Sequence, residues 1–201
     1  MIDTKEISND TTLVIDTGAG TSPTREEILP LPILSDGHPK LAVALEEFDE
    51  KQIHTAEIQK FIKQLKMTMK TYNGVGLSAN QCGFSFRMFV MGAGDFEAVC
   101  INPRIVDVAE DAELVRKREG CLSYPGLFLY VPRYEAIQVE YTDENGQVVN
   151  TWLSGITAQV YQHELDHMNG IVYTEKVGPL AQQMARKRQA KLIKKIKKQY
   201  A

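Results

Sequence analysis

The sequence predicts an α+β fold, in which a run of antiparallel strands lies between one helix and two later helices. Three observations support this prediction. Apolar residues recur at helical spacing over residues 55–72 and again after residue 154. Segments rich in β-branched and aromatic residues separate these two helices. A last segment combines helical spacing with many basic residues. Helices segregated from a run of strands are typical of α+β domains.

The first half of the chain is predicted from local patterns. Residues 1–27 are polar and rich in Gly, Thr and Ser, so we expect a flexible extension. The segments FRMFVMGA (86–93) and EAVCINPRIVDV (97–108) are predicted strands. Ahead of them, a helix over 55–72 is indicated by apolar residues three or four positions apart, which are Ile58, Phe61, Ile62, Leu65, Met69 and Tyr72.

A hairpin and two helices are predicted for the second half. The segments EAIQVEYT and QVVNTWLS flank Asn145-Gly146, a dipeptide typical of two-residue hairpin turns. Ser154 is the predicted N-cap of the next helix, and Gly170 fits its C-terminal end. The last helix is expected to begin at about Pro179.

Length and composition indicate one globular domain. The chain has 201 residues, 43% of them hydrophobic, which suffices for a sizeable core. No apolar run is long enough to cross a membrane, and the N-terminus lacks the basic start and apolar block of a secretory signal. Three cysteines do not make a disulfide framework. We therefore expect a cytoplasmic protein, in which a reduced cysteine is available as a metal ligand.

The charge is unevenly distributed along the chain. Residues 178–201 hold eight Lys or Arg and no acid, so the remainder carries −11, given the total of −3. A basic tail on an acidic body suggests a polyanionic partner for the tail. The alternative is a solvated amphipathic helix with one face packed on the domain and no partner.

The pentapeptide HELDH (163–167) has the clearest chemical signal. Side chains four positions apart lie on one face of a helix, so His163 and His167 can bind one ion together. Ile156 and Val160 continue the same inward face toward the start of the helix. The alternative is a pair of core histidines bonded to backbone.

The two carboxylates between these histidines differ in direction. Glu164 follows Val160 by four positions and leans toward the ligand face, where it can take a proton from an attacking water. Asp166 points away from this face and is expected at the surface or behind the ligands.

A third ligand is needed, because catalytic zinc-like sites have three protein ligands and one open position. In HExxHxxGxxH proteins a later histidine completes the site, but Tyr173 occupies that position here. Cys121 lies in EGCLSYPG, whose Gly and Pro predict an irregular backbone that can aim a side chain. It is favoured over the other upstream candidates, which are Cys82, Cys100, His38 and His54.

Three separated stretches together resemble peptide deformylase. They are GVGLSANQ (74–81), EGCLS (119–123) and HELDH (163–167), and their order and spacing are also similar to that family. The likeness extends from about Ile28 to the basic tail. It implies antiparallel and mixed β-sheets around a central HExxH helix. It also implies a metal-dependent hydrolase that removes formate from N-formylmethionyl chains.

The resemblance implies a role for individual residues. Glu164 would be the catalytic acid/base, and the Gln81 side-chain amide and the Leu122 N–H would stabilise the oxyanion. One divalent ion is implied, natively Fe(II), which Zn(II), Ni(II) or Co(II) could replace. Its implied ligands are Cys121, His163 and His167.

Substrate contacts follow from glycines and helix phase. An extended peptide could add beside GVGL as an extra strand, because glycine lets a backbone approach closely. Gly74 has an alternative role as a helix C-cap. The methionine side chain is expected between Val160, Tyr161 and Leu122. The expected substrate-binding residues are Val75, Gly76, Gly120 and Val160.

The sequences around Gln81 and Cys121 each contain residues whose role has alternatives. The family commonly has Ala, Pro and Ile where this chain has Ser78, Asn80 and Cys82, and loss of the proline is expected to loosen the loop. Glu119 either anchors the loop of Cys121 by pairing with Arg133 or Arg118, or it is solvated.

The expected organisation is a flexible extension (1–27), a catalytic metallohydrolase domain (28–178) and a basic C-terminal helix (179–201). The implied partners are N-formylmethionyl peptides, nascent chains and the ribosome, whose RNA the basic helix would contact, and a monomer without membrane contact is expected. Two rival functions are an HExxH zinc endopeptidase, which needs a downstream His or Glu ligand, and a metal-stabilised RNA-binding module without an open ligand position.

Overall fold

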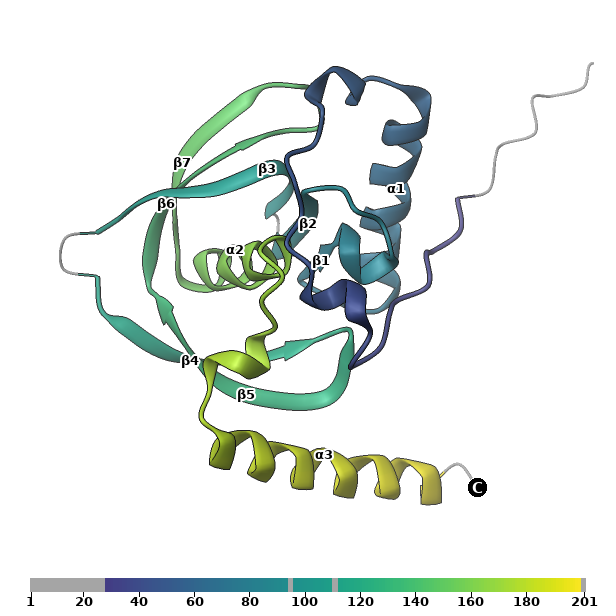
Figure 1. Ribbon diagram of the computed structural model, residues 1–201, viewed down its shortest axis with the longest axis vertical. Coiled ribbons are helices and arrows are strands. Elements are labelled where there is room, and N and C mark those ends of the chain that lie inside the picture. Colours follow the sequence, from purple (N-terminus) through teal and green to yellow (C-terminus); the bar gives the residue numbers. More distant parts are fainter. Residues whose placement is uncertain (1–27, 94–95, 110–111, 200–201) are drawn as a thin grey trace, which may run out of the picture.

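The computed structural model describes residues 28–93, 96–109 and 112–199 (Figure 1). A five-stranded antiparallel sheet has the order β1-β2-β3-β6-β7, and β4 pairs with β5 separately. The strands are β1 (Gly76–Ser78), β2 (Met88–Ala93), β3 (Phe96–Val108), β4 (Leu114–Cys121), β5 (Tyr124–Tyr134), β6 (Ala136–Thr142) and β7 (Val148–Ser154). The helices are α1 (Ala56–Thr71), α2 (Gly155–Met168) and α3 (Pro179–Gln199). Short 3-10 turns are η1 (Pro39–Ala42), η2 (Glu50–Gln52), η3 (Ala79–Cys82) and η4 (Tyr173–Lys176). The predicted α+β class is confirmed, whereas the extension predicted for 1–27 lies outside the described residues.

Helix α1 forms where the apolar spacing predicts it. The Thr55 hydroxyl accepts the Ile58 N–H at 3.4 Å and so caps the helix. The chain leaves the helix through Asn73, whose φ of 54° is one that Asn tolerates better than most residues. This turn leads directly into β1, so α1 fixes where the glycine-containing stretch begins.

The five-stranded sheet is covered by a helix on each face. Met88 and Val90 of β2 belong to the core cluster that contains the buried side of α1. Phe89 and Met91, their neighbours, belong to the cluster formed with α2. Side chains alternate between the faces of a strand. The uninterrupted apolar sequence of β2 is therefore explained by burial on both sides.

Helix α2 occupies the centre of the molecule, between the large sheet and the β4–β5 hairpin (Figure 1). All residues from Ala158 to Met168 are buried, as expected of a helix enclosed by protein. Ser154 takes the N-cap position, although its side chain makes no capping hydrogen bond. The helix ends two residues before Gly170, whose φ is 70°. The HELDH pentapeptide therefore forms the buried last turns of α2.

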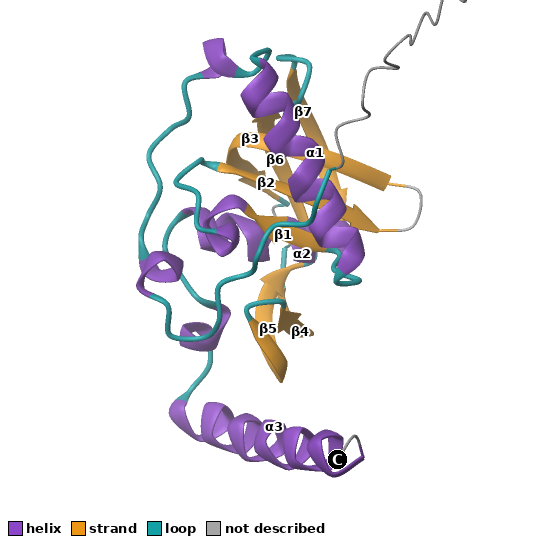
Figure 2. Ribbon diagram, turned by 90° about the vertical axis from the view of Figure 1, so that its right-hand side faces the viewer, coloured by secondary structure: helices purple, strands orange, loops and turns teal. Residues whose placement is uncertain are grey.

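The β4–β5 hairpin forms a smaller core with η4 and α3. Leu127 and Val131 of β5 are buried with Tyr173 and with Ala185 of α3. Figure 2 shows α3 lying across the end of the molecule beyond this hairpin. The predicted C-terminal helix is confirmed. Among the described residues no helix has the length and apolarity needed to span a bilayer.

The turn between β6 and β7 differs from the predicted two-residue turn. Thr142 pairs with Val148, so residues 143–147 form the loop. The Asp143 carboxylate accepts the N–H of Asn145 at 2.9 Å and of Gln147 at 2.8 Å. Asp commonly stabilises turns by such bonds to the backbone that follows it. The Asn-Gly dipeptide thus marks the turn, but Asp143 determines its length.

Strands β4 and β5 are not predicted by the sequence patterns. The backbone around Cys121 was expected to be irregular, yet Cys121 is the last residue of β4, and Leu122 and Ser123 form the turn into β5. The reason is that most side chains of β4 are exposed, so its sequence LVRKREGC lacks apolar alternation. Its pairing with β5 defines it instead.

Replacing Gly170 by Ala is expected to destabilise the protein more than replacing Gly155 by Ala. Both glycines have positive φ, but a Cβ at Gly170 would lie 2.6 Å from the Ala44 nitrogen, whereas nothing lies within 4 Å at Gly155. Urea denaturation should give a loss of about 1 kcal/mol for Gly155→Ala from backbone strain, and at least about 2 kcal/mol for Gly170→Ala because of the added clash. Equal losses would contradict this close approach.

Candidate functional site

Cys121 at the end of β4 lies against two histidines of α2. Its Sγ is 3.4 Å from His167 Nε2, and the ligand atoms of Cys121, His163 and His167 lie within 4.8 Å of one another. In a tetrahedral site with metal–sulfur and metal–nitrogen bonds of about 2.3 and 2.0–2.1 Å, sulfur and nitrogen are separated by about 3.6 Å. One thiol and two imidazoles in this arrangement fit a single divalent ion.

The surroundings of the two histidines set their charge differently. Burial, with the positive charges of His163 and Arg133, lowers the pKa of His167 well below its usual value. Burial also opposes the charge of His163, but hydrogen bonds with Cys121 and Glu119 outweigh it and raise the pKa of His163 well above its usual value. His167 is therefore neutral, as a ligand must be, whereas His163 would release a proton on binding an ion.

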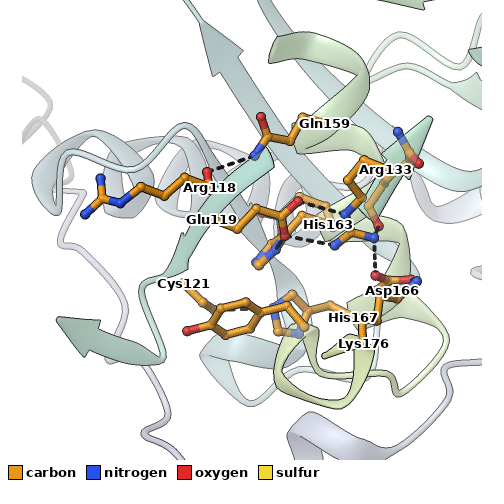
Figure 3. Close-up of polar contacts among 12 residues, drawn as sticks. Arg118, Glu119, Cys121, Arg133, Gln159, His163, Asp166, His167 and Lys176 are labelled. Carbon is orange, nitrogen blue, oxygen red and sulfur yellow. Dashed lines mark hydrogen bonds and ion pairs between the residues drawn. The ribbon is translucent and has the colours of Figure 1, made fainter. Parts of the chain in front are cut away.

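A buried ionic network lies behind His163 (Figure 3). The Glu119 carboxylate accepts His163 Nδ1–H at 3.0 Å and two Arg133 N–H groups at 2.7 and 2.9 Å. Arg133 also donates to Asp166 at 2.5 Å, and Lys176 pairs with Asp166 at 2.8 Å. A carboxylate on one ring nitrogen fixes the tautomer and direction of a histidine ligand. The network therefore directs the other nitrogen of His163 toward Cys121.

This network decides two predictions that the sequence left open. Glu119 pairs with Arg133 and is neither solvated nor paired with Arg118. Burial disfavours the charge of Glu119, but the hydrogen bonds from His163 and Arg133 outweigh burial and lower its pKa. Asp166 lies behind the ligands and is buried.

Glu164 lies on the side of α2 that faces β1. The Ser78 hydroxyl donates to Glu164 Oε2, and a Cβ at Gly76 would collide with Oε1. This close approach requires glycine at position 76. Burial raises the pKa of Glu164, although His163 and Ser78 oppose the shift. A carboxyl group with a raised pKa beside the three ligands is suited to accept and return a proton.

Gln81 is buried in η3 with its amide held in one orientation. The Ser78 N–H donates to Gln81 Oε1 at 2.9 Å. The amide nitrogen therefore faces the other way, 3.2 Å from Cys121 Sγ and 3.1 Å from Ser123 Oγ. A donor in this position is what the predicted oxyanion role requires.

Asn80, which stands where proline was expected, ties η3 to α2. Its Nδ2 donates to the His167 carbonyl at 3.0 Å, and its side chain is buried. This side-chain hydrogen bond gives the loop an attachment to α2 that proline would not provide, and the expected loosening stays a prediction. Asn80 Oδ1 and His167 Nδ1 are buried without partners among the described residues.

The other candidate ligands named from the sequence do not belong to the cluster of Cys121, His163 and His167. Burial raises the pKa of Cys82 to about 12 and that of Cys100 well above its usual value, which disfavours their thiolates. His38 caps η1 by accepting the Lys40 N–H. The Tyr173 ring packs beside His163, but its hydroxyl donates to the Leu127 carbonyl at 2.9 Å.

A cavity of about 520 Å³ is lined by Cys121 and His163, two of the three candidate ligands, and by Glu164. Tyr161, predicted as part of its wall, is absent from the lining. Its fully buried ring lies on the sheet side of α2, where the hydroxyl donates to the carbonyls of Arg104 and Glu140. A step of one residue turns a helix by about 100°, which separates Tyr161 from Val160. The other predicted substrate-contacting residues line the cavity, and they are Val75, Gly76, Gly120, Leu122 and Val160.

Most residues of the outer wall, which is the solvent-exposed part of the cavity lining, were not predicted from the sequence. Ile156, placed on the inward stripe, is 53% exposed at this wall, because α2 begins there. The spacing of Ile156 and Val160 was the one available signal. Tyr72 of this wall belongs to the helical spacing of residues 55–72, which predicted a helix but no site. No sequence pattern marked Arg118, Phe128 or Gln159 as lining residues.

Removal of the buried guanidinium by Arg133→Met is expected to lower the free energy of unfolding by about 3–5 kcal/mol, because Glu119 and Asp166 stay buried without their partner. The matched control is Lys117→Met, which breaks a more exposed pair with Glu135 and should cost about 1 kcal/mol or less. Urea denaturation measures both. Similar losses for the two variants would contradict the importance of the network.

Comparison with known proteins agrees with this geometry. Residues 30–183 match the polypeptide deformylase family. The peptide deformylase of Thermotoga maritima is 35% identical over 159 residues, which are 79% of this chain and 92% of that protein. The structure of a peptide deformylase from Synechococcus elongatus in complex with actinonin is similar with a TM-score of 0.73 and 33% identity, covering 80% of this chain and 86% of that one.

A peptide deformylase from Acinetobacter baumannii with bound Met-Ala-Ser is similar with a TM-score of 0.70 and 27% identity, covering 75% of this chain and all of that one. Fold, ligand cluster and sequence therefore agree with the resemblance carried by the three motifs. This chain belongs to the peptide deformylase family, whose members are hydrolases that remove the N-formyl group from nascent peptides.

Proposed function

We propose that this chain hydrolyses the formyl amide of N-formylmethionyl polypeptides and releases formate. The observation that carries this proposal is the buried Glu164 carboxyl group, with its raised pKa, beside Cys121, His163 and His167 in an open cavity. The Met-Ala-Ser peptide bound to the Acinetobacter relative supports a product whose N-terminal residue is methionine.

We further propose that Cys121, His163 and His167 hold one divalent ion, natively Fe(II), with Zn(II), Ni(II) or Co(II) as substitutes. When bound, such an ion would acidify a water molecule and polarise the formyl oxygen. Sites of this kind bind Zn(II) more tightly than Fe(II). Metal content therefore has to be measured together with formate release in protein prepared without oxygen, because a thiolate ligand is oxidisable.

In this mechanism Glu164 moves the protons. It accepts one from the attacking water and returns one to the leaving amine nitrogen. The Ser78 hydroxyl binds Oε2 and Gly76 leaves space at Oε1. Together they hold the carboxyl group in one orientation, with one oxygen bonded to the protein and the other available for proton transfer.

Gln81 and Leu122 stabilise the negative charge that develops on the formyl oxygen. In support of this role, the Ser78 N–H binds Gln81 Oε1 and so leaves the amide nitrogen on the side of Cys121. Leu122 follows Cys121 directly, so its N–H is next to the sulfur ligand. Loss of one donor of this kind typically lowers the rate by about 100- to 1000-fold.

The substrate backbone is proposed to lie along β1. This strand is at the edge of the five-stranded sheet, and Val75 and Gly76 line the cavity. An extended peptide can add to such an edge through main-chain hydrogen bonds. Leu122 and Val160 then provide the apolar surface for the methionine side chain.

Replacing Glu164 by Gln is expected to lower kcat for a formyl-Met peptide by about 100- to 10,000-fold, because proton transfer is lost. Metal content should stay that of the wild type, since Glu164 is outside the ligand cluster. Formate release and elemental analysis measure the two effects. The control is Glu175→Gln, which changes an exposed residue of η4 and should retain activity. Persisting activity of Glu164→Gln would exclude its role, and no formate from iron-loaded wild type would reject the proposed function.

We also propose that α3 contacts ribosomal RNA. Its first half is docked, because Ala185 is buried, Arg186 pairs with Asp36, and Gln189 donates to the Pro125 carbonyl at 2.9 Å. Its second half is exposed and carries lysines without acids. Such a surface is suited to phosphates, and it places the enzyme near newly made chains.

Replacing Lys194, Lys195, Lys197 and Lys198 together by Gln is expected to weaken ribosome binding by about tenfold or more at low salt and to reduce its salt dependence. Co-sedimentation with ribosomes over a salt series measures this. Formate release from a free peptide should be unchanged, which serves as the internal control. Unaltered sedimentation would leave α3 as a packed, solvated helix.

A further inference from the structure

An outward-facing group of side chains at the cavity mouth is not used by the proposed mechanism. Arg118 and Gly120 of β4 face outward, because Glu119 between them turns into the core. Phe128 of β5 covers Gly120 so closely that a Cβ there would lie 2.7 Å from the ring. The Arg118 guanidinium carbon is 4.0 Å from the centroid of this ring. We name Gly120, Phe128 and Arg118 the Arg118–Phe128 shelf.

The shelf holds its cation in a fixed place. The Arg118 carbonyl accepts Gln159 Nε2–H at 3.0 Å, which ties this part of β4 to α2. Stacking on an aromatic face restricts the guanidinium further. Figure 3 shows the Arg118 side chain extending away from Glu119 and the buried network. The guanidinium group is therefore positioned at the outer wall of the cavity.

Among the residues that line the cavity, Arg118 has a charged side chain that is exposed to solvent. The carboxylates and the histidine of the lining are buried and bonded, Glu119 to Arg133, His163 to Glu119, and Glu164 to Ser78. No carboxylate of the described residues pairs with Arg118. A stacked cation without a partner at a binding cavity favours a ligand carboxylate.

We propose that the Arg118–Phe128 shelf is a specificity subsite for an acidic side chain at the second or third residue of the formylated peptide. This inference rests on the proposed deformylation. A peptide whose formyl group lies at the three ligands and whose backbone follows β1 leaves the cavity through its mouth. Successive residues of an extended peptide advance by about 3.3 Å, so the residues just after methionine are those that pass the shelf.

The test is formate release from C-terminally amidated formyl-Met-Xaa-Ser and formyl-Met-Ala-Xaa, with Glu, Ala or Lys as Xaa. Amidation removes the terminal carboxylate, which could itself bind Arg118. For one of the two positions we expect wild-type KM to be about two- to fivefold lower for Glu than for Lys, as for an exposed ion pair. High salt should reduce this difference, and kcat should change little.

Arg118→Gln should abolish the preference and Arg118→Glu should reverse it, both measured as the ratio of KM for the Lys peptide to KM for the Glu peptide. The matched control is Arg116→Gln, two residues earlier on the same exposed face of β4 but outside the cavity lining. It should keep the preference. Equal KM for Glu and Lys peptides in wild type, or a preference that survives Arg118→Gln, would overturn the subsite while deformylation stands. Absence of formate from every peptide would instead reject deformylation, and the subsite with it.

Discussion

The buried pairing of Arg133 with Glu119 is the interaction on which the site depends. It joins the two strands of the β4–β5 hairpin, and through His163 and Asp166 it joins that hairpin to α2. Burial of each of these ions costs several kcal/mol. The network persists because each charge has a partner of opposite sign. The same bonds direct His163, so the contact that holds the hairpin in place also shapes the ligand cluster.

A second constraint is the close approach of the glycine-containing stretch to the β4–β5 turn and to α2. A Cβ at Gly74 would lie 2.8 Å from the Leu122 side chain, and one at Gly76 would lie 2.9 Å from Val160. Small residues here let β1 lie directly against the helix. Ser78 and Asn80 use the proximity for hydrogen bonds to Glu164 and to the His167 carbonyl. Both side chains therefore attach the glycine-containing stretch to α2 by hydrogen bonds.

Helix α3 supports the hairpin from outside. The Gln189 side-chain amide donates a hydrogen bond to the Pro125 carbonyl, and the Arg186 guanidinium lies 5.6 Å from the centre of the Tyr124 ring. Tyr124 and Pro125 also line the cavity. At Gly126, whose φ is 75°, Leu192 occupies the space beside the backbone. The basic helix is therefore attached to the segment that forms one side of the cavity.

The sequence by itself determined the features that depend on local spacing. Two histidines four positions apart share a helix face whatever surrounds them, so HELDH predicted the helix, the paired ligands and the side on which Glu164 lies. The first helix and the basic helix followed from the same periodicity. The third ligand did not, because Cys121 is 46 residues from His167 in the chain. Its Gly- and Pro-containing surroundings favoured Cys121 over the other cysteines and histidines, and the resemblance of EGCLS to a known family then implied the same residue.

Tertiary structure alone decided the rest. Strand β4 is polar on its exposed side and acquires its conformation from pairing with β5. The sequence offered Arg133 only as one of two possible partners of Glu119, and its pairing with both Glu119 and Asp166 appears only in the folded structure. The Arg118–Phe128 shelf likewise requires two strands side by side. In each case the interaction joins residues distant in sequence, and a local pattern carries no information about which distant partner will lie opposite.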